Sequence, residues 1–395
     1  MKIAIIGGSI AGCAVALLLK DKFDVTIFER SKDLKSRGAG ITISKELLQT
    51  LISKDLLDKE TMVYSSSTRS FYCQLPSKPD YGHCLWNQNI SIVSLHWDTL
   101  FLNLRKRIPD KLYKNECRII DVKLKDGESS QVILASGETQ EFDLIIFADG
   151  SQSMGRKLIS ESSQLTYSGY VAWRGILDFD LIKDKSPFIN NTPYYCFNNG
   201  HLLAYPVNHD DIKKLNWVLY EKLPIEDLDS LGQTTQIDFS ETATTHLHQL
   251  ANSKLPKAIA QIIINTKSPF MQKIVDVGVE RLITKAGLLL GDSSVVLRPH
   301  VGSGASLAIQ DALNLREQLD IYDNISQAIA QWEKHTLPNR LSTYALSKRI
   351  GDALVLNPSL WQGMDESKMD IWWEQIILGE KWYTTNEQVT PSYVV

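Results

Sequence analysis

The chain has 395 residues, of which 43% are hydrophobic and 22% are charged. That length accommodates two domains with substantial cores, and the composition is that of an ordinary globular protein. The 42 Lys and Arg against 46 Asp and Glu give a formal net charge of −4 without a basic block, so neither nucleic acid nor an anionic membrane surface is an expected partner.

The first 30 residues predict a strand, a glycine turn, a helix and a second strand. The apolar run Ile3–Ile6 and the β-branched run Val25–Phe28 are typical of buried parallel strands. Between them a glycine cluster opens an apolar helix, whose free N–H groups suit a pyrophosphate. The candidate phosphate-binding residues are Gly7, Gly8, Ser9, Ile10, Ala11 and Gly12. Glu29, at the end of the second strand, is spaced to accept from a ribose hydroxyl.

Two other interpretations of this segment compete. Residues 3–19 carry no charge, as in a signal peptide or a membrane anchor. Glycines and a serine interrupt that run early and a strand follows, so stable membrane insertion is not expected. A Rossmann-like unit that binds nothing stays open, because one degenerate glycine motif has low specificity.

A glycine-rich loop follows the second strand. Arg30 comes directly after the acidic residue, and Arg37 precedes a glycine pair that ends at Gly40. Close glycines suit a backbone that passes tightly against a flat or charged ligand, and equally suit a plain turn into a strand.

The next elements alternate between helix and strand. Ser44 is a good N-cap for a helix that reaches Leu57. Residues 64–92 predict short, aromatic-rich strands, and residues 94–108 predict a second helix with cations near its C-terminus. The strands of residues 64–92 are the first segment expected to lie outside the nucleotide-binding layer.

Two later strands end in acidic, glycine-containing turns. Residues 142–147 and 286–290 are apolar runs typical of buried parallel strands. They end in Asp149-Gly150 and Gly291-Asp292 respectively, at the edge where α/β sheets bind ligands. A long helix opens near Gly302 shortly after the second turn. One nucleotide-binding domain is therefore expected to be assembled from both ends of the chain.

The middle of the chain has a different pattern. Residues 167–222 contain aromatic runs separated by turn residues, which predict an antiparallel sheet, and residues 235–266 predict helices. His246 and His248 lie two apart on one of these helices and point to different faces, so a solvated helix is expected and no metal site. The five cysteines show no CxxC spacing, which favours a reduced, cytoplasmic setting.

In combination, these separated motifs resemble those of the flavin-dependent aromatic hydroxylases, the class A FAD monooxygenases of the para-hydroxybenzoate hydroxylase group. The matching stretches are GGSIAG, ERS with RGAGI, SLHWDTL, FADGSQS, YVAWRG, YPV with NWVLY, and GDSSVVLRPHVGSGASLAIQDA. The resemblance covers the chain from its first residue to the end of the long helix.

The resemblance implies an α/β fold with a Rossmann-like FAD-binding domain, an antiparallel-sheet substrate domain and a helical C-terminal region. The expected FAD-binding domain is discontinuous and comprises residues 1–68, 93–166 and 275–345. Residues 69–92 and 167–274 are the expected substrate domain, and residues 346–395 the helical tail.

By position, the resemblance assigns Gly7, Ser9 and Gly12 to the FAD pyrophosphate, Glu29 to the adenosine ribose, and Asp292 to ribityl or pyrophosphate oxygens. Where many relatives carry an arginine, this chain has Trp97. The full set of expected cofactor-binding residues is Gly7, Gly8, Ser9, Ile10, Ala11, Gly12, Glu29, Arg30, Arg37, Gly40, Trp97, Asp149, Gly150, Gly291, Asp292, Gly302 and Gly304. Arg37 and Arg156 are candidate phosphate partners by their position near the motifs.

The implied chemistry agrees with these residues. The helix opening at Gly302–Gly304 would offer N–H donors and its dipole to the negative charge of reduced flavin, and Pro299, which lacks an N–H, would shape the other edge. The family implies that NADPH or NADH reduces FAD and that the reduced flavin traps O2 as a C4a-hydroperoxide. A small, electron-rich aromatic or heteroaromatic substrate then attacks the distal oxygen.

A phenol-like substrate usually needs a base within hydrogen-bond reach. His201, Tyr205 and His300 are the candidates, the first two from the aromatic sheet expected to cover the flavin. For each of them, ordinary packing is an equally good interpretation.

Other functions remain open. The same FAD motifs would serve a redox sensor or partner-binding flavoprotein that hydroxylates nothing, and the same chemistry would serve a polycyclic antibiotic-like phenolic. Four of the nine tryptophans lie in the tail: Trp361, Trp372, Trp373 and Trp382. They suit a homodimer contact, a cap over the substrate entry, or core packing.

Overall fold

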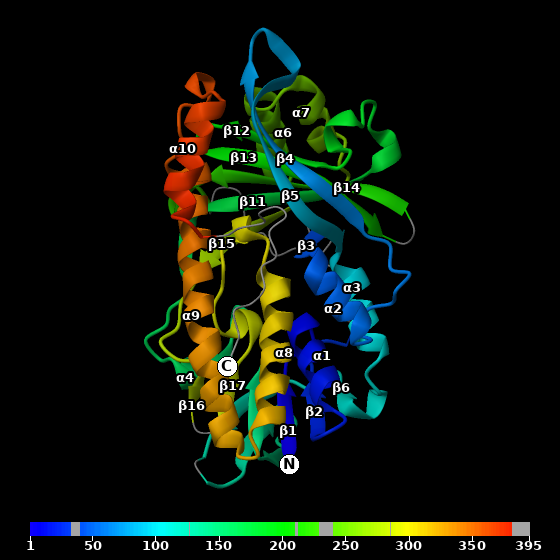
Figure 1. Ribbon diagram of the computed structural model, residues 1–395, viewed down its shortest axis with the longest axis vertical. Coiled ribbons are helices and arrows are strands. Elements are labelled where there is room, and N and C mark those ends of the chain that lie inside the picture. Colours follow the sequence, from blue (N-terminus) through cyan, green and yellow to red (C-terminus); the bar gives the residue numbers. More distant parts are fainter. Residues whose placement is uncertain (33–39, 126, 210–211, 229–239, 285, 381–395) are drawn as a thin grey trace.

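The computed structural model describes residues 1–32, 40–125, 127–209, 212–228, 240–284 and 286–380. Within these residues the strands form three sheets of six, eight and three strands. Figure 1 shows the six-stranded sheet with α1, α8 and α9 in the lower half and the larger sheet across the upper half.

The six-stranded sheet is the expected nucleotide-binding sheet. Its strands, in spatial order, are β16 (Ile283–Thr284), β17 (Gly287–Leu289), β10 (Leu144–Phe147), β1 (Lys2–Ile6), β2 (Asp24–Phe28) and β6 (Tyr113–Lys114). β1 pairs in parallel with β2 and β10, and β10 with β17. Because these strands run the same way, the turns that follow them meet at one edge of the sheet.

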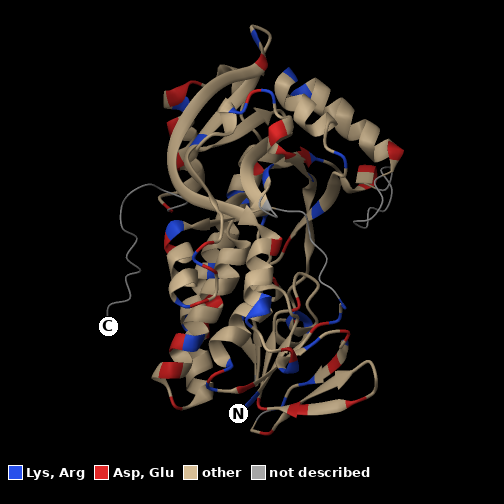
Figure 2. Ribbon diagram, turned by 90° about the vertical axis from the view of Figure 1, so that its right-hand side faces the viewer, with Lys and Arg blue, Asp and Glu red and all other residues tan. Residues whose placement is uncertain are grey.

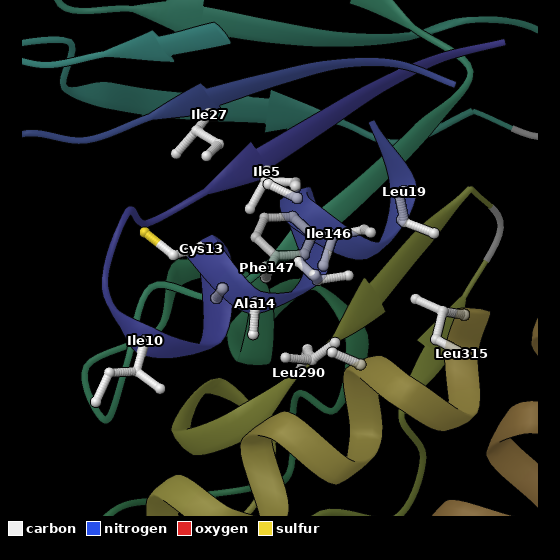
Figure 3. Close-up of a cluster of buried hydrophobic side chains, with 14 of the residues drawn as sticks. Ile5, Ile10, Cys13, Ala14, Leu19, Ile27, Ile146, Phe147, Leu290 and Leu315 are labelled. Atoms are coloured by element: carbon white, nitrogen blue, oxygen red, sulfur yellow. The ribbon is translucent and has the colours of Figure 1, made fainter. Parts of the chain in front are cut away.

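Helices from distant parts of the chain cover this sheet. α1 (Ile10–Leu19) and α8 (Gly304–Ile321) pack together over it. Figure 3 shows Ala14 of α1 beside Phe147 of β10 and Leu290, with Leu315 of α8 close by. This shared core explains why the α1 sequence is apolar nearly all round: eight of its ten residues are buried.

The eight-stranded sheet carries the aromatic runs. Its strands, in order, are β15 (Phe270–Asp276), β11 (Thr166–Asp178), β14 (Ile212–Lys222), β13 (Gly200–His209), β12 (Asn191–Phe197), β4 (Tyr64–Leu75), β5 (Lys78–His96) and β3 (Gly40–Ser44). Side chains alternate between its faces. One face, with Trp173 and Trp217, packs against α6 (Glu241–Lys254) and α7 (Lys257–Ile264). The other, with Tyr170 and Tyr220, faces the C-terminal end of α9 (Ile325–Gly351) and α10 (Glu366–Ile377).

The remaining elements connect or cover these sheets. The third sheet is a meander of β7 (Ile119–Lys123), β8 (Ser130–Leu134) and β9 (Thr139–Phe142). The other helices are α2 (Lys45–Ser53), α3 (Trp97–Lys106), α4 (Met154–Ile159), α5 (Ile225–Leu228), α6 (Glu241–Lys254), α7 (Lys257–Ile264), α9 (Ile325–Gly351) and α10 (Glu366–Ile377). Single turns comprise η5 (Gly291–Ser293), η6 (Pro299–Val301) and the π-helical η7 (Asp352–Leu356).

Some predicted elements differ from the observed ones. The expected short strands of residues 64–92 are two long strands, because β4 and β5 pair over most of their length and β5 continues to His96 to pair with β3. The second helix therefore begins at Trp97 and not at Ser94, with the His96 ring accepting from the N–H of Asp98 at 3.2 Å. The predicted N-cap at Ser44 is confirmed: its hydroxyl accepts from the N–H of Leu47 at 3.1 Å.

The C-terminal tryptophans belong to the core of the eight-stranded sheet. Trp361 and Trp373 are 2% and 5% exposed, and Trp373 lies beside Trp86 of β5 with ring centroids 6.1 Å apart. Trp86 donates to Asp370 of α10 at 2.8 Å. These tryptophan side chains therefore pack in the core of this chain. Trp382 lies outside the described residues.

Charges of both signs are interspersed over the helices and loops (Figure 2). In the described part of the chain, no helix is long and apolar enough to span a membrane. The predicted domain boundaries stay a prediction, and α9 runs across the one placed at residue 345.

Candidate active site

Three turns meet at the carboxyl edge of the six-stranded sheet. They follow β1, β10 and β17, which are adjacent in the sheet. Gly7 has φ +104°, and a Cβ there would lie 2.3 Å from the carbonyl oxygen of Ala148. Gly291 has φ +70°, and a Cβ there would lie 3.1 Å from Ala11 and 3.2 Å from Ala308. The sequence motifs that were far apart are therefore one structural unit, joined by glycine contacts.

The turn into α1 presents free backbone donors. A Cβ at Gly12 would lie 1.9 Å from the carbonyl oxygen of Gly7, so only glycine lets the helix begin this close to the strand. Ser9 is the N-cap, and its side chain makes no capping hydrogen bond. The first N–H groups of α1, which includes the predicted Ile10 and Ala11, thus remain for an anion.

Glu29 is held in place at the end of β2. Its carboxylate accepts from the N–H of Gly8 and from that of Ser31, each at 2.8 Å. Gly8 also packs on Tyr113, whose hydroxyl donates to the Gly8 carbonyl at 3.0 Å. The N–H of Gly8 therefore serves the carboxylate, and the role of Gly8 is to orient Glu29.

Asp149 carries an unused acceptor. One carboxylate oxygen, Oδ2, accepts from the N–H of Met154 at 2.8 Å, while Oδ1 is buried without a partner. Burial is the main cause of its raised pKa. Gly150 follows with φ +80° and open space where a side chain would be.

Arg156 connects two of the turns through its guanidinium, and its role as a phosphate partner stays a prediction. It is 4% exposed, and its guanidinium donates to four backbone carbonyls. Nε donates to those of Ser293 at 3.0 Å and Ser294 at 3.3 Å, Nη1 to that of Ser151 at 2.8 Å, and Nη2 to that of Asp292 at 2.7 Å. It thereby fixes the turn after β10 against the turn after β17.

The start of α8 connects the two sheets. Ser303 is its N-cap and makes no side-chain capping hydrogen bond. A Cβ at Gly304 would lie 3.9 Å from Oδ1 of Asp292, so that exposed carboxylate is beside the helix start. The hydroxyl of Thr42 on β3 donates to the carbonyl of Gly302 at 3.4 Å, and Gly302 has φ +59°.

Gly40 begins β3, the edge strand of the eight-stranded sheet, and contacts residues of β13 and β14. Its N–H donates to Oδ1 of Asn216 at 2.8 Å, and a Cβ there would lie 2.8 Å from the ring of Tyr205. The predicted base candidate Tyr205 is thus beside the glycine loop, and it is 6% exposed.

The other cofactor candidates are more peripheral. Arg30 is exposed, and Trp97 stacks on Phe101 with ring centroids 5.0 Å apart. Arg37 lies outside the described residues.

The two histidine candidates lie together in a buried aromatic cluster. The rings of His201 on β13 and His300 on η6 have centroids 5.3 Å apart, with Tyr220 at 4.8 Å from the first and 4.4 Å from the second. Nε2 of His300 is 2.8 Å from the hydroxyl of Tyr170. Pro299 begins the turn that carries His300.

Burial keeps both imidazoles neutral. Burial lowers the pKa of His201 to about 3. It lowers the pKa of His300 well below its usual value, and the charges of Arg298 and Arg174 act in the same direction. Neither nitrogen of His201, nor Nδ1 of His300, has a hydrogen-bond partner.

Sequence reasoning missed the arginine that anchors η6. The Nε of Arg298, the residue before Pro299, donates to Oδ2 of Asp276 at 2.6 Å and its Nη1 to Oδ1 of Asp352 at 2.6 Å. Asp276 also accepts from Tyr344 at 2.9 Å. These partners lie on β15, η7 and α9, so no local pattern reveals them.

His246 lies on the predicted helix, α6, where most residues are at least partly exposed. It makes contacts that the sequence did not predict: it stacks on Trp173 with ring centroids 5.7 Å apart, and its Nε2 is 2.9 Å from Oε1 of Glu221. Among the described residues, no group of three His, Cys, Asp or Glu side chains is placed to hold a metal ion.

The site fits FAD. The starts of α1 and α8 have no side-chain cap, so their N–H groups can donate to the pyrophosphate. The carboxylate of Glu29 at the sheet edge can accept from a ribose hydroxyl, and the unpartnered oxygen of Asp149 can accept from another donor of the cofactor. The family model described as FAD binding domain-like matches residues 167–276, which include β11 to β14 and α6 and α7. The fold and the site resemble those of the class A flavin-dependent aromatic hydroxylases, and the protein is an FAD-dependent monooxygenase.

Particular relatives agree with this class. The chain is 27% identical to the 2,6-dihydroxypyridine 3-monooxygenase of Paenarthrobacter nicotinovorans, over 85% of this chain and 87% of the relative. It is 24% identical to the 6-methylsalicylate 1-monooxygenase atA of Aspergillus terreus, over 94% and 89%. The solved 2,6-dihydroxypyridine-3-hydroxylase from Arthrobacter nicotinovorans superposes with a TM-score of 0.83 at 26% identity, covering 92% of this chain and 94% of that one.

Proposed function

We propose that this monooxygenase uses NAD(P)H and O2 to hydroxylate a small aromatic or heteroaromatic ring that bears a hydroxyl group, of phenol or hydroxypyridine type. One observation supports this most directly: the uncapped start of α8 lies beside Asp292 and directly follows η6, whose His300 belongs to the buried cluster with His201 and Tyr220. Bound FAD supplies the electron transfer and the oxygen activation. The named relatives act on hydroxypyridine and salicylate rings.

The chain's own groups position the reactants. The N–H groups and dipole of α8 favour negative charge that develops at its start. Arg156 and Arg298 hold the two turns, η5 and η6, that precede this helix start, so the donors keep their geometry. The aromatic side chains of the sheet exclude water and offer flat surfaces to a ring.

The histidines act as neutral groups in this scheme. A phenol loses its proton with a pKa of about 10. Burial lowers the pKa of His201 to about 3 and that of His300 well below its usual value, so both imidazoles are weak bases for that proton. His201 and His300 in their buried state therefore orient an oxygen by hydrogen bonding, and removal of a proton from a neutral hydroxyl falls to another group or to water.

Two finer points belong to the proposal. We propose a cytoplasmic location, because all five cysteines are free. A homodimer is supported by apolar side chains on and beside α10, where Leu360, Ile371 and Leu378 are 80%, 55% and 66% exposed. Light scattering of the full chain measures the assembly directly.

The testing experiment is anaerobic. FAD-loaded protein is mixed with NADPH, and separately with NADH, and bleaching of the oxidised flavin is followed with and without 2,6-dihydroxypyridine, salicylate and a polycyclic phenolic. We expect one of the single-ring ligands to accelerate bleaching by at least tenfold and to yield a hydroxylated product when oxygen is admitted. If no ligand matters and neither nucleotide reduces the flavin, the proposed function is wrong.

A further inference from the structure

Aromatic rings continue from the buried histidine cluster toward another strand. The ring centroid of Tyr170 lies 6.2 Å from that of Tyr220. His201 stacks on Tyr220 at 4.8 Å and on Tyr194 of β12 at 5.6 Å. All four side chains are buried. The histidine cluster is therefore one end of a longer row of rings on this face of the eight-stranded sheet.

Phe71 of β4 joins this row to the tryptophans of the tail. Its ring stacks on Tyr194 at 5.0 Å, and its other neighbours are Trp86 of β5 at 5.5 Å and Trp372 of α10 at 6.1 Å. Trp373 lies 6.0 Å from Trp372. Trp372 is partly exposed, whereas Trp86 and Trp373 are buried. The rings that lead from the site to the surface form an aromatic row of Tyr170, Tyr220, His201, Tyr194, Phe71 and Trp372.

The residue types in the aromatic row share a property beyond their size. Leu, Ile and Phe fill a core without polar atoms, so packing alone does not require phenol and indole rings at these positions. Among the aromatic side chains, Tyr and Trp lose one electron most readily. At most one ring that is harder to oxidise, His201 or Phe71, separates each of them from the next along the row. Because an electron can tunnel between rings in contact, the row connects the site with the surface.

The inner end of the aromatic row has an acceptor for a proton. The hydroxyl of Tyr170 lies 2.8 Å from Nε2 of His300. A phenol that has lost an electron is a far stronger acid than an intact phenol, so even a weakly basic neutral imidazole can take its proton. Oxidation at Tyr170 therefore leaves a neutral tyrosine radical, with its proton kept beside it on His300.

The outer end of the aromatic row reaches water. Trp372 is partly exposed, so this indole can exchange a proton with solvent. Its neighbour Trp373 is 5% exposed and lies beside the guanidinium of Arg69, which is 4.6 Å from the ring centroid. That positive charge disfavours a second positive charge on the ring of Trp373. Trp372 is therefore the expected end of the path.

We propose that the aromatic row is a path for single electrons, by which Trp372 at the surface restores a side chain that has been oxidised in the active site. This protective activity is additional to hydroxylation. It suits a protein that handles O2 beside oxidisable rings, because a tyrosine radical left in the site would otherwise react irreversibly with the substrate or with neighbouring side chains.

Electrons and protons balance along this path. The oxidant is a hydroxyl radical, formed when O2 is reduced without hydroxylation of a substrate. It takes one electron from Tyr170 and becomes hydroxide, while the phenol proton moves to Nε2 of His300. One electron then passes along the row from Trp372 to Tyr170, which takes its proton back from His300. Trp372 releases its N–H proton to water, where it neutralises the hydroxide. A soluble thiol finally gives the Trp372 radical a hydrogen atom and becomes a thiyl radical.

A pulse of blue light tests the path in the oxidised, FAD-loaded protein, without NADPH, substrate or oxygen. The excited flavin replaces the hydroxyl radical as the one-electron oxidant. Time-resolved absorption and electron paramagnetic resonance then identify the type of ring that holds the radical. In the wild type we expect a tyrosine radical that converts to a tryptophan radical. In Trp372→Phe the tryptophan radical should be lost, and in Tyr194→Phe most of its signal should be lost.

Tyr195→Phe is the matched control for Tyr194→Phe. Tyr195 is the next residue of β12 and is 1% exposed, but it packs in the core on the opposite face of the sheet. Its hydroxyl has no hydrogen-bond partner among the described residues, so removing it breaks no hydrogen bond. We expect this variant to form the tryptophan radical as the wild type does. FAD content and melting temperature report whether each variant is folded.

A second measurement needs only the wild type, and it decides the proposal even if a variant does not fold. After the same illumination, oxygen is admitted in the dark and mass spectrometry of peptides locates the oxidised side chains. We expect oxidation at Trp372, and its absence there overturns the proposal.

The radical measurements can overturn the proposal in three ways. The wild type may form no tryptophan radical, Trp372→Phe may keep it at the wild-type yield, or Tyr195→Phe may lose as much of it as Tyr194→Phe. Neither measurement uses NADPH or a substrate. Failure of NAD(P)H to bleach the flavin would therefore reject the proposed function and leave this proposal to be decided by the radical and peptide results.

Discussion

The two halves of the site differ in the groups that form them: backbone groups in one half and side chains in the other. On the FAD side, the edge of the six-stranded sheet uses backbone: glycines at close approach and helix starts without side-chain caps. On the substrate side, the face of the eight-stranded sheet uses side chains, with His201, Tyr220 and His300 packed ring against ring. Main-chain geometry suits a constant cofactor such as FAD, whereas in the proposed function the second half binds the substrate and its choice of ligand depends on these side chains.

This difference predicts how each half responds to substitution. Adding atoms to the backbone side should abolish cofactor binding, because backbone cannot move aside. Removing polar atoms from the side-chain face should change ligand choice and pH dependence while the fold persists. The experiments below test this contrast from the largest expected effect to the smallest.

Gly12→Ala should give the largest effect. The new Cβ would lie 1.9 Å from the carbonyl oxygen of Gly7, so α1 or β1 must shift, at a cost of about 3 kcal/mol or more. We expect loss of bound FAD, measured by the ratio of flavin to protein absorbance, and a lower urea midpoint.

Gly363→Ala is the control for that change, since nothing lies within 4 Å of a Cβ there. It should keep FAD and stability. A Gly12→Ala protein that retains FAD at wild-type affinity would contradict the claim that backbone approach defines this half.

His201→Phe should produce an intermediate effect that depends on pH. In the folded protein the pKa of His201 is lowered to about 3. Below the unfolded pKa of about 6.5 the unfolded chain therefore binds more protons than the folded protein, and the free energy of unfolding decreases as the pH is lowered. The loss is about 1.4 kcal/mol per pH unit in that range. Urea unfolding at pH 6.5 and pH 4.5 should show the variant losing on the order of 2–3 kcal/mol less than the wild type. If the wild type and the variant lost the same free energy of unfolding between pH 6.5 and pH 4.5, His201 would be protonated in the folded protein.

His246→Gln should produce the smallest effect, with the opposite dependence on pH. The hydrogen bond to Glu221 raises the folded pKa of His246. Its stabilisation is therefore fully present below the unfolded pKa and is lost as pH rises through the folded pKa. We expect the variant to be less stable than the wild type by less than about 1 kcal/mol at pH 6 and equally stable at pH 9. Unfolding free energies at the two pH values measure this, and a constant difference would argue against the ion pair.

The sequence by itself determined the FAD half. Strand periodicity, the glycine spacing, and the acidic turns after residues 147 and 290 are local signals, and each records a backbone requirement of a few consecutive residues. Ser44 as an N-cap is a signal of the same local kind, and the structure confirms it.

Only the tertiary structure decided the substrate half. The cluster of His201, Tyr220 and His300 depends on the pairing of β13 with β14 and on the packing of η6 against them, and the contacts of Arg156 join two turns more than 130 residues apart. Side-chain pKa values likewise follow from burial, which the chain acquires only when the sheet face is covered. Backbone geometry is encoded by a few consecutive residues, whereas the residues that surround a side chain depend on which distant segments pack together.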